Sequence, residues 1–526
     1  MSFAGETAEL VIGVDGFTGT KNHAVVTPSQ LLTAENITYE NGTLQKEGGS
    51  AKYNSTTISG SPAVLGGWDW FPASGTQRLI VFLSDGDLKK DTGGGDFTVD
   101  LKTGLTTTNV VPVFIEGGKE AAANNRKLFL FTGLNVVQVL SADGSTTSNI
   151  ANPPSDWTGS YQPTTGCIHE NRLWGGGNSN DPHRVYASLP TNHEDYTTTS
   201  LNFSIFPGEG EKIVQIISFK GLLVIFKYPK GIYLLDTSNS DTDEWRVSKH
   251  STTIGGISPL GGVLIDDDIL FIDHTASFYF ISAITEFGNI GSRNLSDIAQ
   301  YDVFIRDEIN LSELPRTQSI YYVAKRIAMF TAASSGTTYD RRLNVDFNRI
   351  QLPRFSTSTK DTNRSIWLRK DSNGVLRPTT GDSSGFVWTL AQDTRSVAGS
   401  GFNAIFQTPH LDLSHLDPAL GIIEKNGKFL ELVVEPKGNW DLSVDVLWDD
   451  VVFQTISFSM GVSGSTLGAF VLGTDKLSGS NLINKRKRLE GSGRRLSLIG
   501  RNSGDGQDFS IAKFYFLFTR GSDRAD

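Results

Sequence analysis

Cysteine is almost missing from this chain, with Cys167 as the single one in 526 residues. One thiol excludes an intrachain disulfide and any zinc site built from several cysteines. Long apolar runs are missing as well, because stretches such as 514–518 fall far short of the roughly 20 residues that a membrane helix needs. Glu6 and Glu9 stand where a secretion signal would need apolar residues. We therefore expect a soluble protein from a reducing compartment, with no membrane insertion by this chain.

Enzyme motifs are also scarce. The sequence contains neither a G-x-x-x-x-G-K-[ST] phosphate loop nor an H-E-x-x-H zinc pair, and its eight histidines are scattered. Three acidic stretches are candidates for calcium or glycosidase chemistry, at 85–96, 238–245 and 266–268. None has the spacing of a known site, so each is interpreted as a solvated turn. We expect no catalytic residue, no metal site and no cofactor.

The composition favours short strands over helices. The 55 glycines, with abundant Ser, Thr, Asn and Asp, indicate many tight turns. Hydrophobic residues make up 38% and aromatic residues 10%, which is enough to build real cores. The net charge of −10 argues against a protein that grips nucleic acid through its phosphates. These features predict an all-β protein of two or three domains.

One local pattern recurs along the middle of the chain. An alternating apolar run meets a turn rich in Gly, Asn or Asp, and a second run follows, as in RLIVFLSDGDL from Arg78 and LLVIFKYPKGIYLL from Leu222. The first apolar positions of seven such units are separated by 49, 45, 49, 47, 58 and 49 residues. These positions are Leu79, Leu128, Leu173, Leu222, Ile269, Ile327 and Leu376.

This spacing leaves room for two further strands in each unit. Four strands at intervals of about 40–50 residues are typical of β-propeller blades. We therefore predict a propeller of five to seven blades over residues 71–395. The longest interval contains a segment that we expect to form a short inserted helix, capped by Ser296.

The two ends of the chain break this rhythm. Residues 1–70 hold only short strand pieces and are predicted to form an N-terminal arm or a divided first blade. Strands after 400 follow one another more closely, which predicts a C-terminal β-sandwich over 396–526. Within it, one stretch of an otherwise acidic chain is strongly basic. It is interpreted either as a solvated hairpin tip or as a contact for an acidic partner or DNA, through Lys485, Arg486, Lys487, Arg488, Arg494 and Arg495.

Four stretches carry a likeness to a known family. They are His169–Ser188 (HENRLWGGGNSNDPHRVYAS), 31–54, 256–282 and 381–388. In the first, a strand ending in Arg-Leu-Trp precedes a turn and a Val-Tyr-x-Ser strand. On these motifs the chain resembles the podovirus tail hub or nozzle family, similar to the packaged-DNA stabilisation protein of P22-like phages and the nozzle of T7-like phages. The strands from 450 onward match nothing in that family.

The resemblance implies a structural protein of the virion tail, assembled in the host bacterial cytoplasm. It implies a homohexameric ring below the portal and adaptor, which continues the channel for double-stranded DNA, retains packaged DNA until ejection and carries tail fibres or spikes. Two alternatives stay open on the fold alone: a propeller that docks receptors or fibres, and a propeller glycosidase acting on surface polysaccharide.

Overall fold

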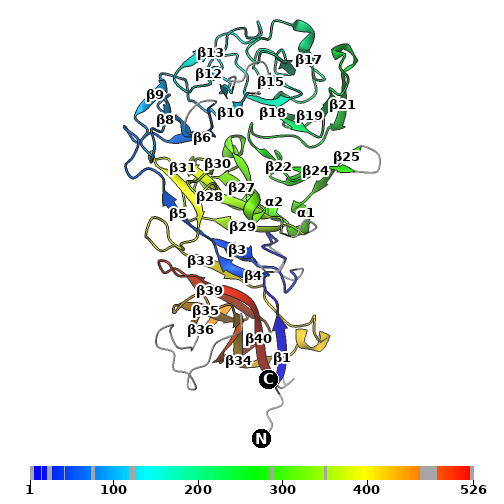
Figure 1. The fold of residues 1–526 in the computed structure, drawn as a ribbon. Helices are drawn as coiled ribbons and strands as arrows, with labels where there is room; N and C mark the ends of the chain where they lie inside the picture. Colours follow the sequence, from blue (N-terminus) through cyan, green and yellow to red (C-terminus); the bar gives the residue numbers. More distant parts are fainter. Residues whose placement is uncertain are drawn as a thin grey trace.

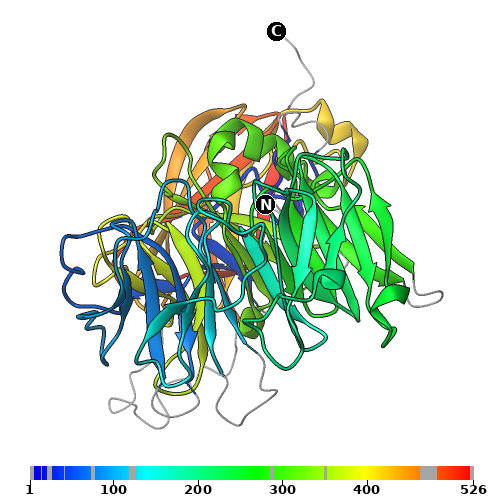
Figure 2. The ribbon, with the colours of Figure 1, turned by 90° about the horizontal axis from the view of Figure 1, so that it is seen from above.

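The computed structural model describes residues 5–13, 15–20, 26–40, 42–72, 77–117, 126–284, 289–348, 352–461 and 482–521. Strands dominate these residues, and the two α-helices are short. Figure 1 shows an elongated molecule with a ring of small sheets at one end and two longer sheets at the other. Figure 2 views the same molecule from the ring end. The predictions of an all-β fold and of a β-propeller are confirmed.

Six four-stranded antiparallel sheets in the described residues are separate blades of the propeller. Five of them follow the chain order without interruption. They are β6–β9 (Val64–Trp70, Arg78–Leu83, Leu88–Lys90, Val99–Lys102), β10–β13 (Val113–Glu116, Leu128–Phe131, Gln138–Leu140, Thr147–Asn149), β14–β17 (Thr165–His169, Arg172–Gly176, Arg184–Ala187, Asn202–Ser204), β18–β21 (Lys212–Phe219, Leu222–Tyr228, Ile232–Asp236, Arg246–Ser251) and β22–β25 (Gly262–Ile265, Asp268–Ile272, Phe278–Ile284, Asn289–Asn294).

The sixth separate blade joins distant parts of the chain. It consists of β30 (Ser365–Lys370), β31 (Leu376–Gly381), β32 (Val387–Gln392) and, on the outside, β5 (Gly49–Lys52). Its inner strand β30 packs beside β6, the inner strand of the first blade. Pairing an N-terminal strand with the last blade fastens the ring where the chain would otherwise leave it open.

A further blade position is filled by part of a larger sheet. The strands β26 (Ser319–Tyr322), β27 (Ile327–Ala332), β28 (Arg341–Asp346) and β29 (Arg354–Ser358) pair in order, and β26 packs between β22 and β30. The outer strand β29 then pairs in parallel with β2 (Thr33–Glu35). From there the sheet continues to nine strands through β33 (Ala404–Gln407), β39 (Leu496–Asn502), β35 (Asp441–Trp448) and β36 (Val451–Ser459).

Each unit of the predicted repeat begins at the same place in a blade. All seven of its first apolar positions fall in the second strand of a four-stranded unit, from Leu79 in β7 to Leu376 in β31. These strands are sandwiched between neighbouring blades and so are buried on both faces, as in β11, where Leu128–Phe131 is buried throughout. Burial on both faces explains why they appear as nearly continuous apolar runs.

The inserted helix lies where it was expected, but its cap is different. The segment between β25 and β26 forms α1 (Ser296–Ala299), α2 (Tyr301–Glu308) and the 3₁₀ helix η4 (Leu311–Arg316). Ser296 is the first helical residue and not the cap, and its hydroxyl accepts a hydrogen bond from the Phe278 N–H at 2.9 Å. The prediction of a Ser296 cap was wrong, because a strand of the neighbouring blade uses that hydroxyl.

Two facing sheets form the far end of the molecule. The far strands of the nine-stranded sheet pack against a seven-stranded sheet, and Trp448 contacts Phe516 across them with ring centroids 5.8 Å apart. At the centre of the seven-stranded sheet, β40 pairs with the N-terminal strands β1 and β4 and with β34. The seven strands are β1 (Glu6–Leu10), β3 (Ile37–Glu40), β4 (Thr43–Lys46), β34 (Lys425–Val434), β37 (Ile483–Arg488), β38 (Ser492–Gly493) and β40 (Ser510–Arg520). We call the seven-stranded sheet and the far strands of the nine-stranded sheet together the distal sheets.

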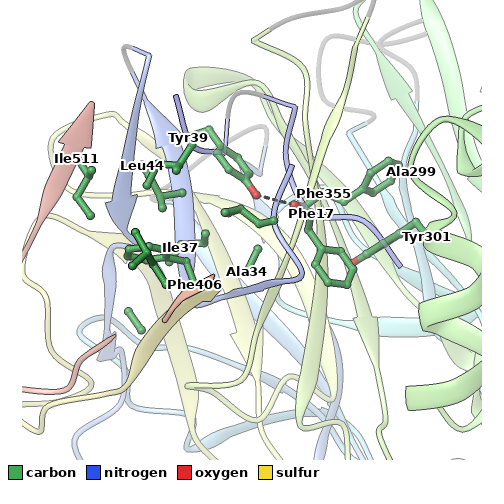
Figure 3. Close-up of a cluster of buried hydrophobic side chains, with 14 of the residues drawn as sticks. Phe17, Ala34, Ile37, Tyr39, Leu44, Ala299, Tyr301, Phe355, Phe406 and Ile511 are labelled. Carbon is green, nitrogen blue, oxygen red and sulfur yellow. Dashed lines mark hydrogen bonds between the residues drawn. The ribbon is translucent and has the colours of Figure 1, made fainter. Parts of the chain in front are cut away.

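One continuous core joins the propeller to the distal sheets. Figure 3 shows Tyr39 and Leu44 from the N-terminal strands between Phe355 of the propeller and Ile511 of β40. The Tyr39 hydroxyl donates a hydrogen bond to the Phe355 carbonyl at 2.9 Å. Tyr301 of α2 stacks on the Phe355 ring from the other side, at 4.3 Å between centroids.

The predicted domain limits at 70 and 395 stay predictions. Within the first 70 residues, β1 to β4 belong to the distal sheets and their junction with the propeller, whereas β5 and the start of β6 belong to blades. The strands after 400 do not form their two layers alone, because N-terminal strands complete both sheets.

Candidate functional site

The basic stretch lies on one edge of the distal sheets. Lys485, Arg486, Lys487 and Arg488 belong to β37, which pairs only with β34 among the described strands. They form an edge strand, because each residue from 483 to 488 has a ladder partner in β34. Arg494 and Arg495 follow the short strand β38.

Carboxylates neutralise half of these six cations. Arg486 pairs with Glu431 at 2.6 Å, Arg488 lies 3.6 Å from Glu490, and Arg495 lies 3.3 Å from Asp450. Lys485 instead donates to the Gly461 carbonyl at 2.6 Å. The side chains of Lys487 and Arg494 have no acceptor among the described residues. Since half of the cations are compensated locally, the stretch is a poor match for a row of phosphates.

Exposed apolar side chains lie beside the basic stretch. Val451, Val452 and Phe453 begin β36 and are 67%, 54% and 58% exposed. The next residue, Gln454, accepts a hydrogen bond from the Glu490 N–H at 3.0 Å, which fixes this strand against the end of the basic one. We call Val451–Phe453 together with the six basic residues the distal edge surface.

The strands β36 and β37, which carry most of the distal edge surface, are edge strands of their sheets. In the part of the chain that the structure describes, β36 pairs only with β35 and β37 only with β34. Each therefore has one row of backbone N–H and C=O groups without a ladder partner. Apolar residues with a basic rim on such an edge are typical of a surface that another protein covers.

A second candidate lies on one face of the propeller. The loops that enter each blade and the loops between second and third strands share this face, because inner strands run in the same direction around the ring. The helix η4 lies between two cavities there, of about 420 and 390 Å³, and Arg316 lines both. We call this face of the propeller, with its two cavities, the axial face. No Asp or Glu is among the described residues that line either cavity.

His169 and Cys167 both lie in β14 of the third blade, in surroundings that shift their pKa values. His169 of β14 lies between the hydroxyls of Ser218 and Thr237, at 2.8 and 2.7 Å, and so joins two blades. Burial lowers its pKa, with a small opposing effect of Glu170. Burial raises the pKa of the Cys167 thiol to about 12. The His169 ring thus joins two blades, and the buried Cys167 thiol stays protonated.

A serine motif that was not predicted occurs in the last blade. The residues Gly381–Gly385 (GDSSG) have the G-x-S-x-G spacing of a hydrolase nucleophile elbow. They form the turn between β31 and β32, whereas an elbow joins a strand to a helix. Ser383 is exposed there and lines the larger axial cavity, whose described lining residues include no histidine.

The acidic stretches behave as turns. Asp91 in 85–96 accepts three backbone hydrogen bonds, from Gly93, Gly95 and Asp96. Asp241 in 238–245 caps the 3₁₀ helix η3 (Thr242–Glu244), and Asp266 begins the tight turn between β22 and β23. Over the described ranges, no group of three His, Cys, Asp or Glu is placed to hold a metal ion.

Within the described residues, no helix has the length and apolar character needed to cross a bilayer.

No family model and no curated protein matches this chain. Solved structures with a similar fold include BBS1N in complex with ARL6DN, soaked with mercury, at 12% identity and a TM-score of 0.40, covering 67% of this chain and 98% of that one. YCF48 from Cyanidioschyzon merolae has 10% identity and a TM-score of 0.38, with 65% and 98% covered. The computationally designed Ika8 protein has 12% identity and a TM-score of 0.35, with 65% and 99% covered. Similarity this low carries no statement about function.

Proposed function

We propose that this chain is a structural component of a bacteriophage tail, a hub or nozzle that forms a homohexameric ring below the portal and adaptor. The observation that carries the proposal is the nine-stranded sheet, which runs without a break from β26 near the propeller axis to the distal edge strand β36. A propeller and a second body joined through one sheet and one core make a stiff, elongated subunit. Stiff subunits suit a ring that surrounds a channel for double-stranded DNA.

The positions of the family-like segments support this proposal. Residues 31–54 form β2 to β5, the strands that connect the propeller with the distal sheets. The segment His169–Ser188 forms β14 to β16 of the third blade, including its buried Leu173 and Trp174. The likeness thus falls on residues that build the shape of the subunit.

In this proposal the two distal sheets are the predicted C-terminal β-sandwich, and the distal edge surface contacts protein. Three of its cations are already paired with carboxylates, so an acidic protein partner suits it better than DNA. The partner would be a neighbouring subunit, the adaptor or portal, or a tail fibre or spike. The virion tail is then the site of action, after assembly in the host bacterial cytoplasm.

Co-assembly tests the proposal. The purified chain is mixed with portal–adaptor complexes of a podovirus, and the particles are imaged in negative stain. We expect six-fold rings extending the portal channel. Particles that remain bare portal–adaptor complexes, while the chain stays monomeric, contradict the proposal.

A second candidate is a module that docks receptors or fibres, which the cavities of the axial face favour. Such a protein would be a monomer or trimer that binds cells. The glycosidase alternative stays a prediction and is tested by hydrolysis of a bacterial surface polysaccharide.

A further inference from the structure

The larger cavity of the axial face is built by residues from three neighbouring blade positions. Its walls come from the start of β6, the loop between β27 and β28, the segment before β30 and the turn between β31 and β32. A volume of about 420 Å³ lies within the usual range of small-molecule sites. It is therefore large enough for an organic ligand and would be mostly empty around a single tetrahedral anion.

One arginine in this cavity has no carboxylate partner in the part of the chain that the structure describes. The Arg364 guanidinium lies over the Tyr339 ring, 4.6 Å from its centroid. None of its N–H groups has an acceptor among the described residues. Stacking fixes the plane of the guanidinium and leaves its donors for a ligand that presents two oxygens.

A buried carboxylate holds this arrangement in place. Glu313 accepts a hydrogen bond from the Tyr339 hydroxyl at 3.0 Å and pairs with Arg316 at 2.7 Å. The negative charge of Glu313 therefore pairs with Arg316, the second guanidinium of the cavity, and no described carboxylate pairs with Arg364.

The carboxylates of Asp340 and Asp382, next to the cavity, accept hydrogen bonds from nearby residues of the chain. Both oxygens of Asp340 accept from Ser334, at 2.8 and 2.6 Å. Asp382 accepts from the Ser384 and Phe386 N–H groups and from the Trp388 indole. Among the described residues, neither carboxylate forms an ion pair with Arg364.

The rest of the wall is rich in hydroxyl groups. Thr337, Thr338, Thr362 and Ser383 line the cavity, are exposed, and have no protein partner for their hydroxyls among the described residues. A hydroxyl both donates and accepts, so it pairs with the hydroxyls of a sugar, whereas a bare anion uses donors only.

We propose that this cavity binds a sugar that carries a carboxylate, with the carboxylate on Arg364 and the sugar hydroxyls on the threonine and serine side chains. The proposal is independent of ring formation. It gives the axial face a ligand class, an acidic saccharide, whether the protein is a hub or a docking module.

Calorimetric titration of the full chain tests the proposal, with D-glucuronate, D-glucose and inorganic phosphate as probes. We expect glucuronate to bind, and glucose and phosphate to bind at least roughly tenfold more weakly. Arg364→Gln should weaken glucuronate binding by roughly tenfold or more, because it removes a charge-assisted bidentate contact. Thr338→Val, at an exposed position, should weaken it by about threefold.

Arg369→Gln is the matched control. Arg369 also stacks on a tyrosine, 4.4 Å from the Tyr53 centroid, but lies in β30 outside the cavity. Its variant should bind glucuronate like the unaltered protein, and thermal melts confirm that all variants fold. Absence of glucuronate binding, equal binding by phosphate, or unchanged affinity in both Arg364→Gln and Thr338→Val would each overturn the proposal.

Discussion

At the scale of single residues, a buried ionic cluster connects the propeller with the N-terminal segment. Arg342 of β28 is fully buried, and its Nη2 atom pairs with the Glu47 carboxylate. The Nη1 atom of Arg342 lies 3.6 Å from Oδ2 of Asp361. Lys360 reaches the same Glu47 at 2.6 Å. Burying these charges is costly unless each is paired, so the cluster specifies one way of joining the segment to the blade.

Arg342→Leu should destabilise the protein strongly. It leaves Glu47 and Asp361 with less positive charge in a buried site, which costs about 3–5 kcal/mol when one partner of a buried pair is removed. Urea unfolding measures the change. Arg246→Leu, which breaks the exposed pair with Glu244 at 3.1 Å, is the control and should change stability by less than about 1 kcal/mol. Equal effects of the two substitutions would show that the cluster adds no specific stability.

Glu47 should also affect how the free energy of unfolding changes with pH in acid solution. Burial alone raises its pKa, but Arg342 and Lys360 outweigh burial and lower the pKa from 4.5 to about 2. A lowered carboxyl pKa stabilises the fold above pH 4.5, and this contribution is lost as the pH falls towards 2. The stability advantage over Glu47→Gln should shrink by about 3 kcal/mol across that window. A constant difference between the two proteins, measured by urea unfolding at several pH values, would contradict this.

At the scale of elements, the distal edge surface offers a test with little risk to the fold. Val452 is 54% exposed on β36, and Val323 is 58% exposed on the 3₁₀ helix η5 (Val323–Lys325) of the propeller. Val452→Asp should reduce assembly at least roughly tenfold, because it adds a charge to an apolar contact, while Val323→Asp should not. Mass photometry measures the assembled fraction, and thermal melts should agree within about 2 °C for both variants. Equal assembly of the two variants would exclude this edge from the contact.

The elements also show how far a sequence predicts this fold. Second strands such as Leu222–Tyr228 are buried on both faces, so their apolar runs stand out and set the phase of the repeat. Outer strands such as Arg246–Ser251 are largely exposed and leave no such signal. The alternation in β40 predicts a strand, but it carries no information on the partner, and Ile511 pairs with Leu44 from the other end of the chain.

The candidate surfaces were predictable to different degrees. The basic stretch from Lys485 is visible in the sequence, but the carboxylate of Glu431 that neutralises Arg486 comes from another strand. The exposure of Val451–Phe453 depends on where the sheet ends, which the sequence does not indicate. The Arg364 cavity collects loops from three blade positions, and no linear motif marks it.

At the scale of the whole molecule, the proposed function requires a rigid subunit that closes into a ring. The measurement that tests this most directly is mass photometry of the purified, unaltered chain over a range of concentrations. We expect a discrete species at six times the monomer mass of 57.2 kDa, with few intermediate species. A chain that stays monomeric or trimeric at every concentration, and binds cells in that form, would contradict it and favour the docking module.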